Sequence, residues 1–98
     1  MKPVSVHRSA RREVSEIVAY LDDKAGEKTG DAFFAELMGA LESLREDHAR
    51  HHFYRGDLRR LNLKRFPYHV LYRVHLTVVR VLVIRHHHRH PDHGIKRH

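Results

Sequence analysis

The strongest constraint on the fold is a series of strand-like segments in the second half of the chain. Within Leu58 to Arg65 apolar and polar residues alternate, so Leu61 and Leu63 lie on one face of an extended chain and Arg60, Asn62 and Lys64 on the other. Pro67 cannot donate a ladder hydrogen bond and belongs at a strand start or edge. Tyr68–Val74 and Val78–Arg85 follow as strands, and the second is rich enough in β-branched residues to be central and buried. This half therefore predicts a three-stranded sheet.

The first half of the chain begins with a short predicted strand and a helix. Val4 and Val6 are compatible with a strand that ends before Ser9. Beyond Ser9, the expected N-cap, apolar residues recur at three- and four-residue steps as far as Ala25. This spacing places them on one face of a helix from about Ser9 to Ala25.

A second helix is expected after a polar break that Gly26 and Gly30 bracket. Asp31 is its predicted N-cap, and its apolar face continues to about Asp47. The apolar faces of the two helices are too wide to be covered by each other alone, so the sheet is the expected partner. Residues 48–57 lack clear periodicity and predict a loop.

Together these elements predict one α+β domain over residues 1–98, in the order β-α-α-β-β-β. An N-terminal helical hairpin packs on one face of a small, mainly antiparallel, twisted sheet, and the opposite face is basic. Ninety-eight residues leave room for one modest core. The absence of cysteine excludes disulfides and thiolate metal sites and is compatible with a cytoplasmic protein. No segment approaches the roughly 20 apolar residues that a membrane span needs.

Charge is distributed unevenly along the chain. Residues 1–49 contain seven Lys/Arg and ten Asp/Glu, a net charge of −3, whereas residues 50–98 contain twelve and two, a net charge of +10. A positive field concentrates polyanions and speeds their encounter. Nucleic acid, the ribosome or a strongly acidic protein is therefore the expected partner.

The basic tail over residues 86–98 is rich in histidine, which raises the question of a metal site. The spacings of His86 and His88, and of His90 and His93, would allow pairs of imidazoles on one ion. Successive residues of an extended segment alternate between faces, however, and no nearby Cys or Glu completes a tetrahedral set. We expect a solvated tail with no specific metal site, and no cofactor.

The stretch from Arg60 to Pro91 gives the chain a resemblance to a known family. Its Phe66-Pro67-Tyr68 turn, and the sequence IRHHHRHP that ends the last strand, fall at the spacing of the RelE/ParE superfamily of toxins. With the amphipathic helical hairpin in front, the chain resembles this superfamily over nearly its whole length. The resemblance implies the growth-arresting toxin of a bacterial type II toxin–antitoxin pair, of the kind associated with plasmid stabilisation. A small cognate antitoxin would hold it inactive in a hetero-oligomeric complex.

The superfamily contains two mechanisms, and the first is RNA cleavage. RelE-like members cut mRNA in the ribosomal A site, which requires activating a ribose 2′-OH, stabilising a phosphate and protonating a leaving oxygen. On this branch the chain would be a metal-independent endoribonuclease whose histidines transfer protons near neutral pH. The resemblance assigns the catalytic positions to Arg60, Lys64, His69, His87 and Arg89. Asn62 and Ile95 stand where RNase members carry Lys and Tyr, so the set is incomplete.

The second mechanism is inhibition of DNA gyrase by ParE-like members, a binding activity that needs a surface and no acid–base set. The long helical hairpin and the missing RNase side chains favour this branch. Ribosome-dependent cleavage is the alternative, a non-toxic basic nucleic-acid-binding module is the second alternative, and enzyme status stays open between them. The residues expected to bind a partner or nucleic acid are Arg60, Lys64, Arg65, Arg85 and Arg89.

Overall fold

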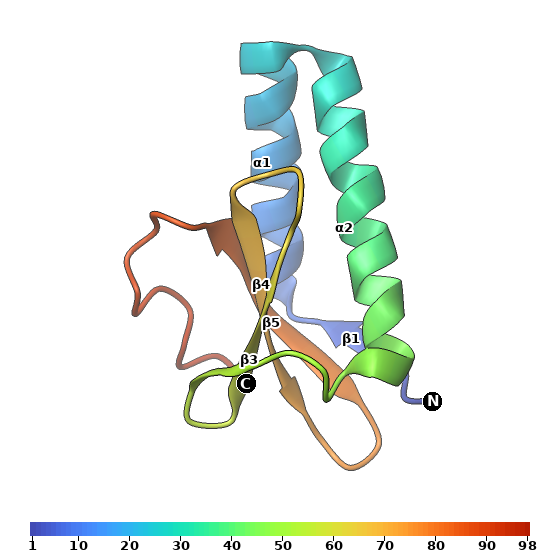
Figure 1. The fold of residues 1–98 in the computed structure, drawn as a ribbon. Coiled ribbons are helices and arrows are strands. Elements are labelled where there is room, and N and C mark those ends of the chain that lie inside the picture. The colour runs from blue at the N-terminus through green and yellow to red at the C-terminus, as the bar shows by residue number, and fades with distance from the viewer.

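The computed structural model describes residues 1–98 as two helices and a five-stranded sheet (Figure 1). In chain order the elements are β1 (Val4–Val6), α1 (Arg8–Ala25), α2 (Glu27–Asp47), β2 (Phe53–Arg55), β3 (Leu58–Asn62), β4 (Tyr68–Val74) and β5 (Val79–His86). The strand order in the sheet is β1-β5-β4-β3-β2, in which β1 runs parallel to β5 and the other neighbours are antiparallel. The predicted α+β fold is confirmed.

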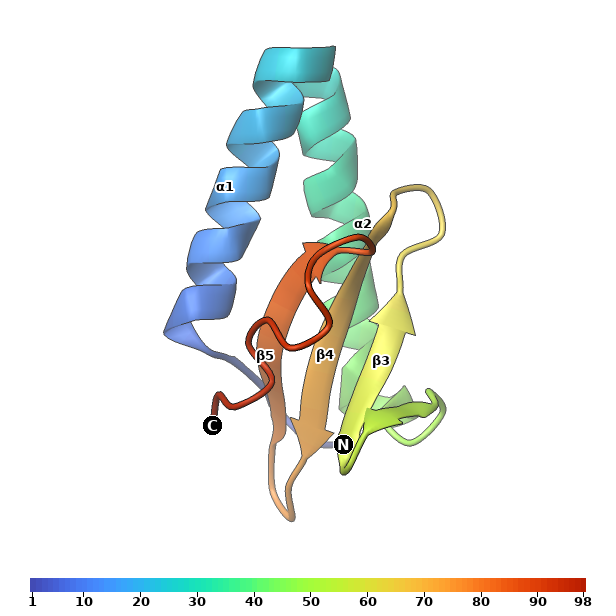
Figure 2. The same cartoon turned by 90° about the vertical axis from the view of Figure 1, so that its left-hand side faces the viewer.

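The helical hairpin covers one face of the sheet, here called the inner face (Figure 2). Thirteen buried residues, all from the helices and strands except Leu63, form one core cluster there, in which Leu37 and Leu44 of α2 and Val70 of β4 are fully buried. Phe33 meets Phe66 and Tyr68 edge to face, with ring centroids 5.6 and 5.2 Å apart. Removing this apolar area from water is the main source of stability.

The two helices are joined by one residue, so the predicted polar break is wrong. α2 begins at Glu27, four residues before the expected N-cap Asp31. Gly26 makes the turn with φ +96°, where a side chain would be strained. Gly30 lies inside α2 and is buried, and a Cβ there would collide with the carboxylate of Asp22 on α1. Gly30 therefore serves close helix packing and does not end a helix.

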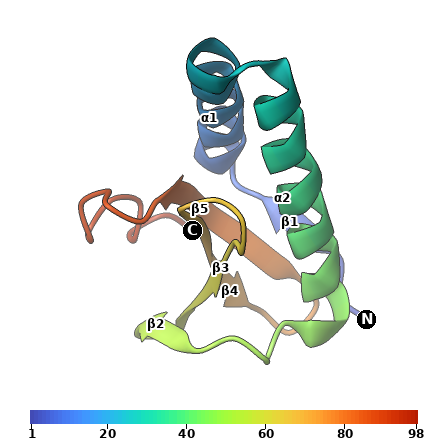
Figure 3. The same ribbon diagram turned by 45° about the horizontal axis from the view of Figure 1, so that its top comes forward.

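A strand that the sequence did not predict forms the outer edge of the sheet. β2 lies in the segment expected to be a loop, at the opposite edge from β1 (Figure 3). It pairs with β3, so that Phe53 stands opposite Arg59. Strand β3 also ends at Asn62, three residues earlier than predicted. The sheet therefore has five strands instead of four.

The opposite, outer face of the sheet was expected to be basic, but its centre is apolar. Leu58, Leu71, Leu82 and Val83 form a second buried cluster there. The C-terminal tail, residues 87–98, folds back across this face (Figure 2), and Ile95 packs against the cluster. The prediction of a solvated tail is therefore wrong, because the tail covers apolar surface.

Candidate functional site

Four of the predicted site residues meet on the outer face of the sheet. Arg60 comes from β3, His69 from β4, Arg85 from β5 and His87 from the start of the tail. The strand register explains the meeting, because His69 stands directly opposite Arg85 across the β4–β5 pair. We call these four residues the outer-face cluster.

Hydrogen bonds fix the protonation of both imidazoles in the outer-face cluster. Arg85 Nε donates to His69 Nε2 over 2.9 Å, so the His69 proton lies on Nδ1. That nitrogen is 2.9 Å from His87 Nδ1, which must therefore accept. His87 Nδ1 also lies 3.3 Å from a second donor, Arg60 Nη2. The two rings stack with centroids 5.2 Å apart, and this arrangement requires both imidazoles to be neutral.

The pKa of each imidazole is consistent with this assignment. Burial, together with the positive charges of Arg60 and Arg85, lowers the pKa of His69 to about 3. Burial and Arg60 also lower the pKa of His87. His69 is only 1% exposed and its one lone pair is occupied by Arg85. The geometry therefore leaves His69 without the free lone pair or dissociable proton that transfer near neutral pH requires.

Arg85 was predicted to bind a partner, but it lies inside the protein with 4% of its surface exposed. Its Nη1 donates to the backbone carbonyls of His90, Pro91 and His93 over 3.1, 3.1 and 2.8 Å. Its Nη2 donates to the Tyr54 hydroxyl over 3.0 Å. A buried guanidinium is tolerated only with partners of this kind. Arg85 therefore organises the tail, and Tyr54 is a member of the site that the sequence did not reveal.

The remaining predicted residues lie elsewhere on the surface. Lys64 and Arg65 are exposed between β3 and β4, where their backbone N–H groups donate to the Glu36 carboxylate of α2 over 2.6 and 3.3 Å. Arg89 is exposed in the tail and lines a separate groove. The structure thus brings Arg60 close to the two histidines, but it does not add Lys64 or Arg89 to them.

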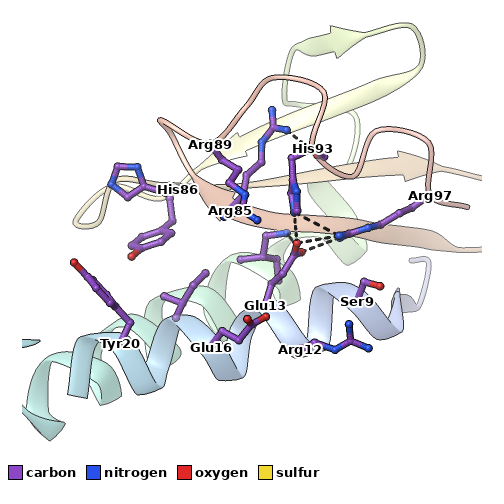
Figure 4. Close-up of a pocket in the computed structure, with 13 residues that line it drawn as sticks. Ser9, Arg12, Glu13, Glu16, Tyr20, Arg85, His86, Arg89, His93 and Arg97 are labelled. Carbon is purple, nitrogen blue, oxygen red and sulfur yellow. Dashed lines mark hydrogen bonds and ion pairs between the residues drawn. The ribbon is translucent and has the colours of Figure 1, made fainter. Parts of the chain in front are cut away.

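The groove that Arg89 lines has a volume of about 440 Å³ and lies between α1, the end of β5 and the tail (Figure 4). Ile17 and Tyr20 supply apolar surface, and Arg12 and His86 add to its basic lining. No group of three or more His, Cys, Asp or Glu side chains in the protein is placed to hold a metal ion. Four arginines and two glutamates, Glu13 and Glu16, line the groove, so its charge balance is positive and suits an organic anion or an acidic peptide better than a cation.

Glu13 closes this groove by holding the tail against α1 (Figure 4). Its carboxylate accepts hydrogen bonds from His93 Nε2 over 2.6 Å and from both terminal nitrogens of Arg97 over 2.9 and 3.0 Å. It also accepts the Ile84 N–H of β5 over 3.1 Å. Burial raises the pKa of Glu13, but the hydrogen bonds from Arg97 and His93 outweigh burial and the net shift is downwards. No sequence pattern pointed to this role of Glu13.

The chain was compared with known protein families, curated sequences and solved structures. A family model of the ParE toxin of the type II toxin-antitoxin system, parDE, matches residues 4–91. A solved structure described as "Chromosomal ParDE TA system from P. aeruginosa" is similar to the chain with 17% sequence identity and a TM-score of 0.78, covering 88% of this chain and 96% of that one. No curated protein sequence matches the chain. Neither helix is long and apolar enough to cross a membrane. The family match contains every helix and strand and leaves residues 92–98 outside.

Proposed function

The chain belongs to the ParE toxin family of type II toxin–antitoxin systems, and on that premise we propose that it arrests growth by binding DNA gyrase and that a cognate antitoxin neutralises it. Both activities are binding activities. They require exposed surfaces of suitable shape and charge, and neither requires a side chain that transfers protons.

The observation that carries this proposal is the state of the two histidines in the outer-face cluster. An endoribonuclease of this superfamily would need an acid and a base that exchange protons at neutral pH. His69 is buried and has a pKa of about 3, and the Nδ1 of His87 accepts a hydrogen bond from it. Such a pair is suited to stabilising the sheet and the tail, and it is poorly suited to acid–base catalysis.

Two further positions agree with a binding protein. Asn62, which replaces a Lys of the RNase members, accepts a hydrogen bond from Arg60 Nε over 2.7 Å. Ile95, which replaces their Tyr, packs on the outer apolar cluster. Both residues take part in contacts within the domain, and neither supplies a charge or a hydroxyl to a phosphate.

The helical hairpin offers a surface that suits the antitoxin. A groove of about 300 Å³ lies between α1 and α2, with Val14, Phe34 and Met38 in its lining. Phe34 is 45% exposed and Met38 38% exposed, which is unusual for large apolar side chains of a helix. An amphipathic segment of the antitoxin that covered this groove would bury them. Arg11, which also lines this groove, would favour an acidic residue in the same segment.

The target is tested with the purified full chain in two assays run side by side. Gyrase supercoiling is measured in one, and cleavage of mRNA in a purified translation extract in the other. We expect supercoiling to be inhibited and the mRNA to stay intact. Cleavage of mRNA with unaffected supercoiling would establish the RelE-like alternative, for which the half-exposed pair Arg60 and His87 is the candidate site.

Induced expression in cells tests toxicity and the role of the cationic surface. We expect the wild type to arrest growth, and co-expression of the cognate antitoxin to restore it. Arg89→Glu reverses an exposed charge beside the groove and should abolish growth arrest without loss of folded protein. Arg8→Glu, at an exposed arginine of α1, is the matched control and should remain toxic. Normal growth with soluble wild type would favour the non-toxic nucleic-acid-binding module.

A further inference from the structure

Phe53 is a large apolar side chain on a free edge of the sheet. It lies on β2, the last strand in the sheet order (Figure 3), and 59% of its surface is exposed. It belongs to neither hydrophobic cluster. Phe34 and Met38, which are also exposed, share the groove between the helices, whereas Phe53 stands apart from it. Its position therefore needs a separate explanation.

Arg59 holds the Phe53 ring from one side. The guanidinium carbon lies 4.0 Å from the ring centroid, and the two residues are direct partners across β2 and β3. Arg59 Nη1 also donates to the carbonyls of Ala49 and His51 over 3.2 and 2.8 Å, which fixes the guanidinium. Because one face of the ring is covered and most of the residue is exposed, the other face is open to solvent.

The same edge is strongly cationic. Residues 50–60 contain four arginines and two histidines but a single carboxylate, Asp57. That carboxylate is paired with Arg73 over 2.8 Å, and Arg55 is paired with Asp92 over 2.6 Å. Arg50 and Arg59 have no carboxylate partner, so their charges can attract an external anion.

We propose that this edge binds single-stranded nucleic acid, with one base stacked on the open face of Phe53 and neighbouring phosphates on Arg50 and Arg59. Single-strand binding combines a positive surface with aromatic rings on which bases stack. A duplex keeps its base faces covered and could use only the charges. The proposal involves neither gyrase nor the antitoxin, so it can succeed or fail independently of the toxin function.

The experiment measures the binding of fluorescently labelled oligonucleotides to the full chain by fluorescence anisotropy, across a series of salt concentrations. A single strand and a duplex of equal length and mixed sequence are compared. We expect the single strand to bind more tightly. Phe53→Ala should weaken its binding about ten-fold and leave the salt dependence unchanged. Arg50→Gln should weaken binding and reduce the slope of log K against log salt by about 0.7.

Matched variants elsewhere on the surface serve as controls. Phe34→Ala removes an exposed phenylalanine from α2, and Arg8→Gln removes an exposed arginine from α1. Both should bind the single strand as the wild type does, and circular dichroism should show that all variants are folded. Equal binding of duplex and single strand, or unchanged binding by Phe53→Ala, would overturn the proposal. An equal loss with Arg8→Gln and Arg50→Gln would also overturn it, because it would indicate attraction by net charge alone.

Discussion

The inner face of the sheet is covered by two helices, and the outer face is covered by irregular chain over residues 87–98 (Figure 2). On the inner face thirteen buried apolar residues form one cluster, and their contacts follow from regular spacing along each element. On the outer face only four buried apolar residues form a cluster, and the tail is held over them by charged and polar groups. The two faces of one sheet are therefore stabilised by different interactions.

Both faces depend on contacts between residues that are far apart in the sequence. Phe33 meets Phe66 and Tyr68 on the inner face, and Glu13 and Arg97, which hold the tail, are 84 positions apart. The family match spans residues 4–91, which include every helix and strand and therefore both faces of the sheet, and it leaves only residues 92–98 of the tail outside.

The largest expected effect tests the inner face. Phe33 is fully buried between α2 and the sheet, in contact with Phe66 and Tyr68. We expect Phe33→Ala to lower the free energy of unfolding by about 3–5 kcal/mol, because the truncation loses burial and leaves a cavity. Phe34→Ala, one position along at an exposed site, should cost less than about 1 kcal/mol. Urea unfolding measures both, and similar losses would show that the inner cluster is not the main core.

Periodicity explains why the inner face could be predicted. The helices, β4 and β5 have apolar residues at steps of three and four or in β-branched runs, and these patterns report burial directly. Gly30 was misread because a glycine is a helix breaker in isolation, whereas here its lack of a Cβ admits Asp22. β2 was missed because it has only three residues, none of them buried, which is too short for an apolar–polar alternation to be recognised.

The outer face could be predicted only in part. The resemblance selected Arg60, His69 and His87, Arg85 was expected to bind a partner, and the structure brings these four together. Their burial and protonation depend on where the tail runs, which no local pattern encodes. For the same reason Arg85, which was expected at the surface, is buried and holds the tail by hydrogen bonds.

A second prediction tests the polar network of the outer face. Arg85→Met keeps an unbranched apolar stem but leaves three tail carbonyls and the Tyr54 hydroxyl without their donor. We expect a loss of about 3 kcal/mol in the free energy of unfolding, with faster amide hydrogen exchange confined to residues 87–98. The inner-face amides should keep their relative order of protection.

Arg89→Met is the control for this prediction, because Arg89 is exposed and its side chain has no hydrogen-bond partner within the protein. It should change stability by less than about 0.5 kcal/mol. If Arg85→Met had equally little effect, the tail would be held by Ile95 and Glu13 alone.

The smallest expected effect is a pH dependence that belongs to the outer face. In the unfolded chain His69 takes up a proton near pH 6.5, but in the folded protein its pKa is about 3, because of burial and the charges of Arg60 and Arg85. Between these values the unfolded state binds more protons, so the stabilising contribution is present above pH 6.5 and is lost as the pH falls. From pH 7.5 to 5 this residue should account for a loss of about 2 kcal/mol.

His69→Gln isolates that contribution, because glutamine does not titrate and its amide oxygen can still accept from Arg85. Unfolding free energies of the two proteins, measured by urea between pH 7.5 and 5, should converge by about 2 kcal/mol at the acid end. His7 and His51, whose pKa values are also lowered by burial, lie outside the outer-face cluster, are present in both proteins and cancel in the difference. Parallel profiles would mean that His69 becomes charged in the folded protein. Water would then reach the outer-face cluster beneath the tail, and the tail would not be tightly packed against the outer face of the sheet.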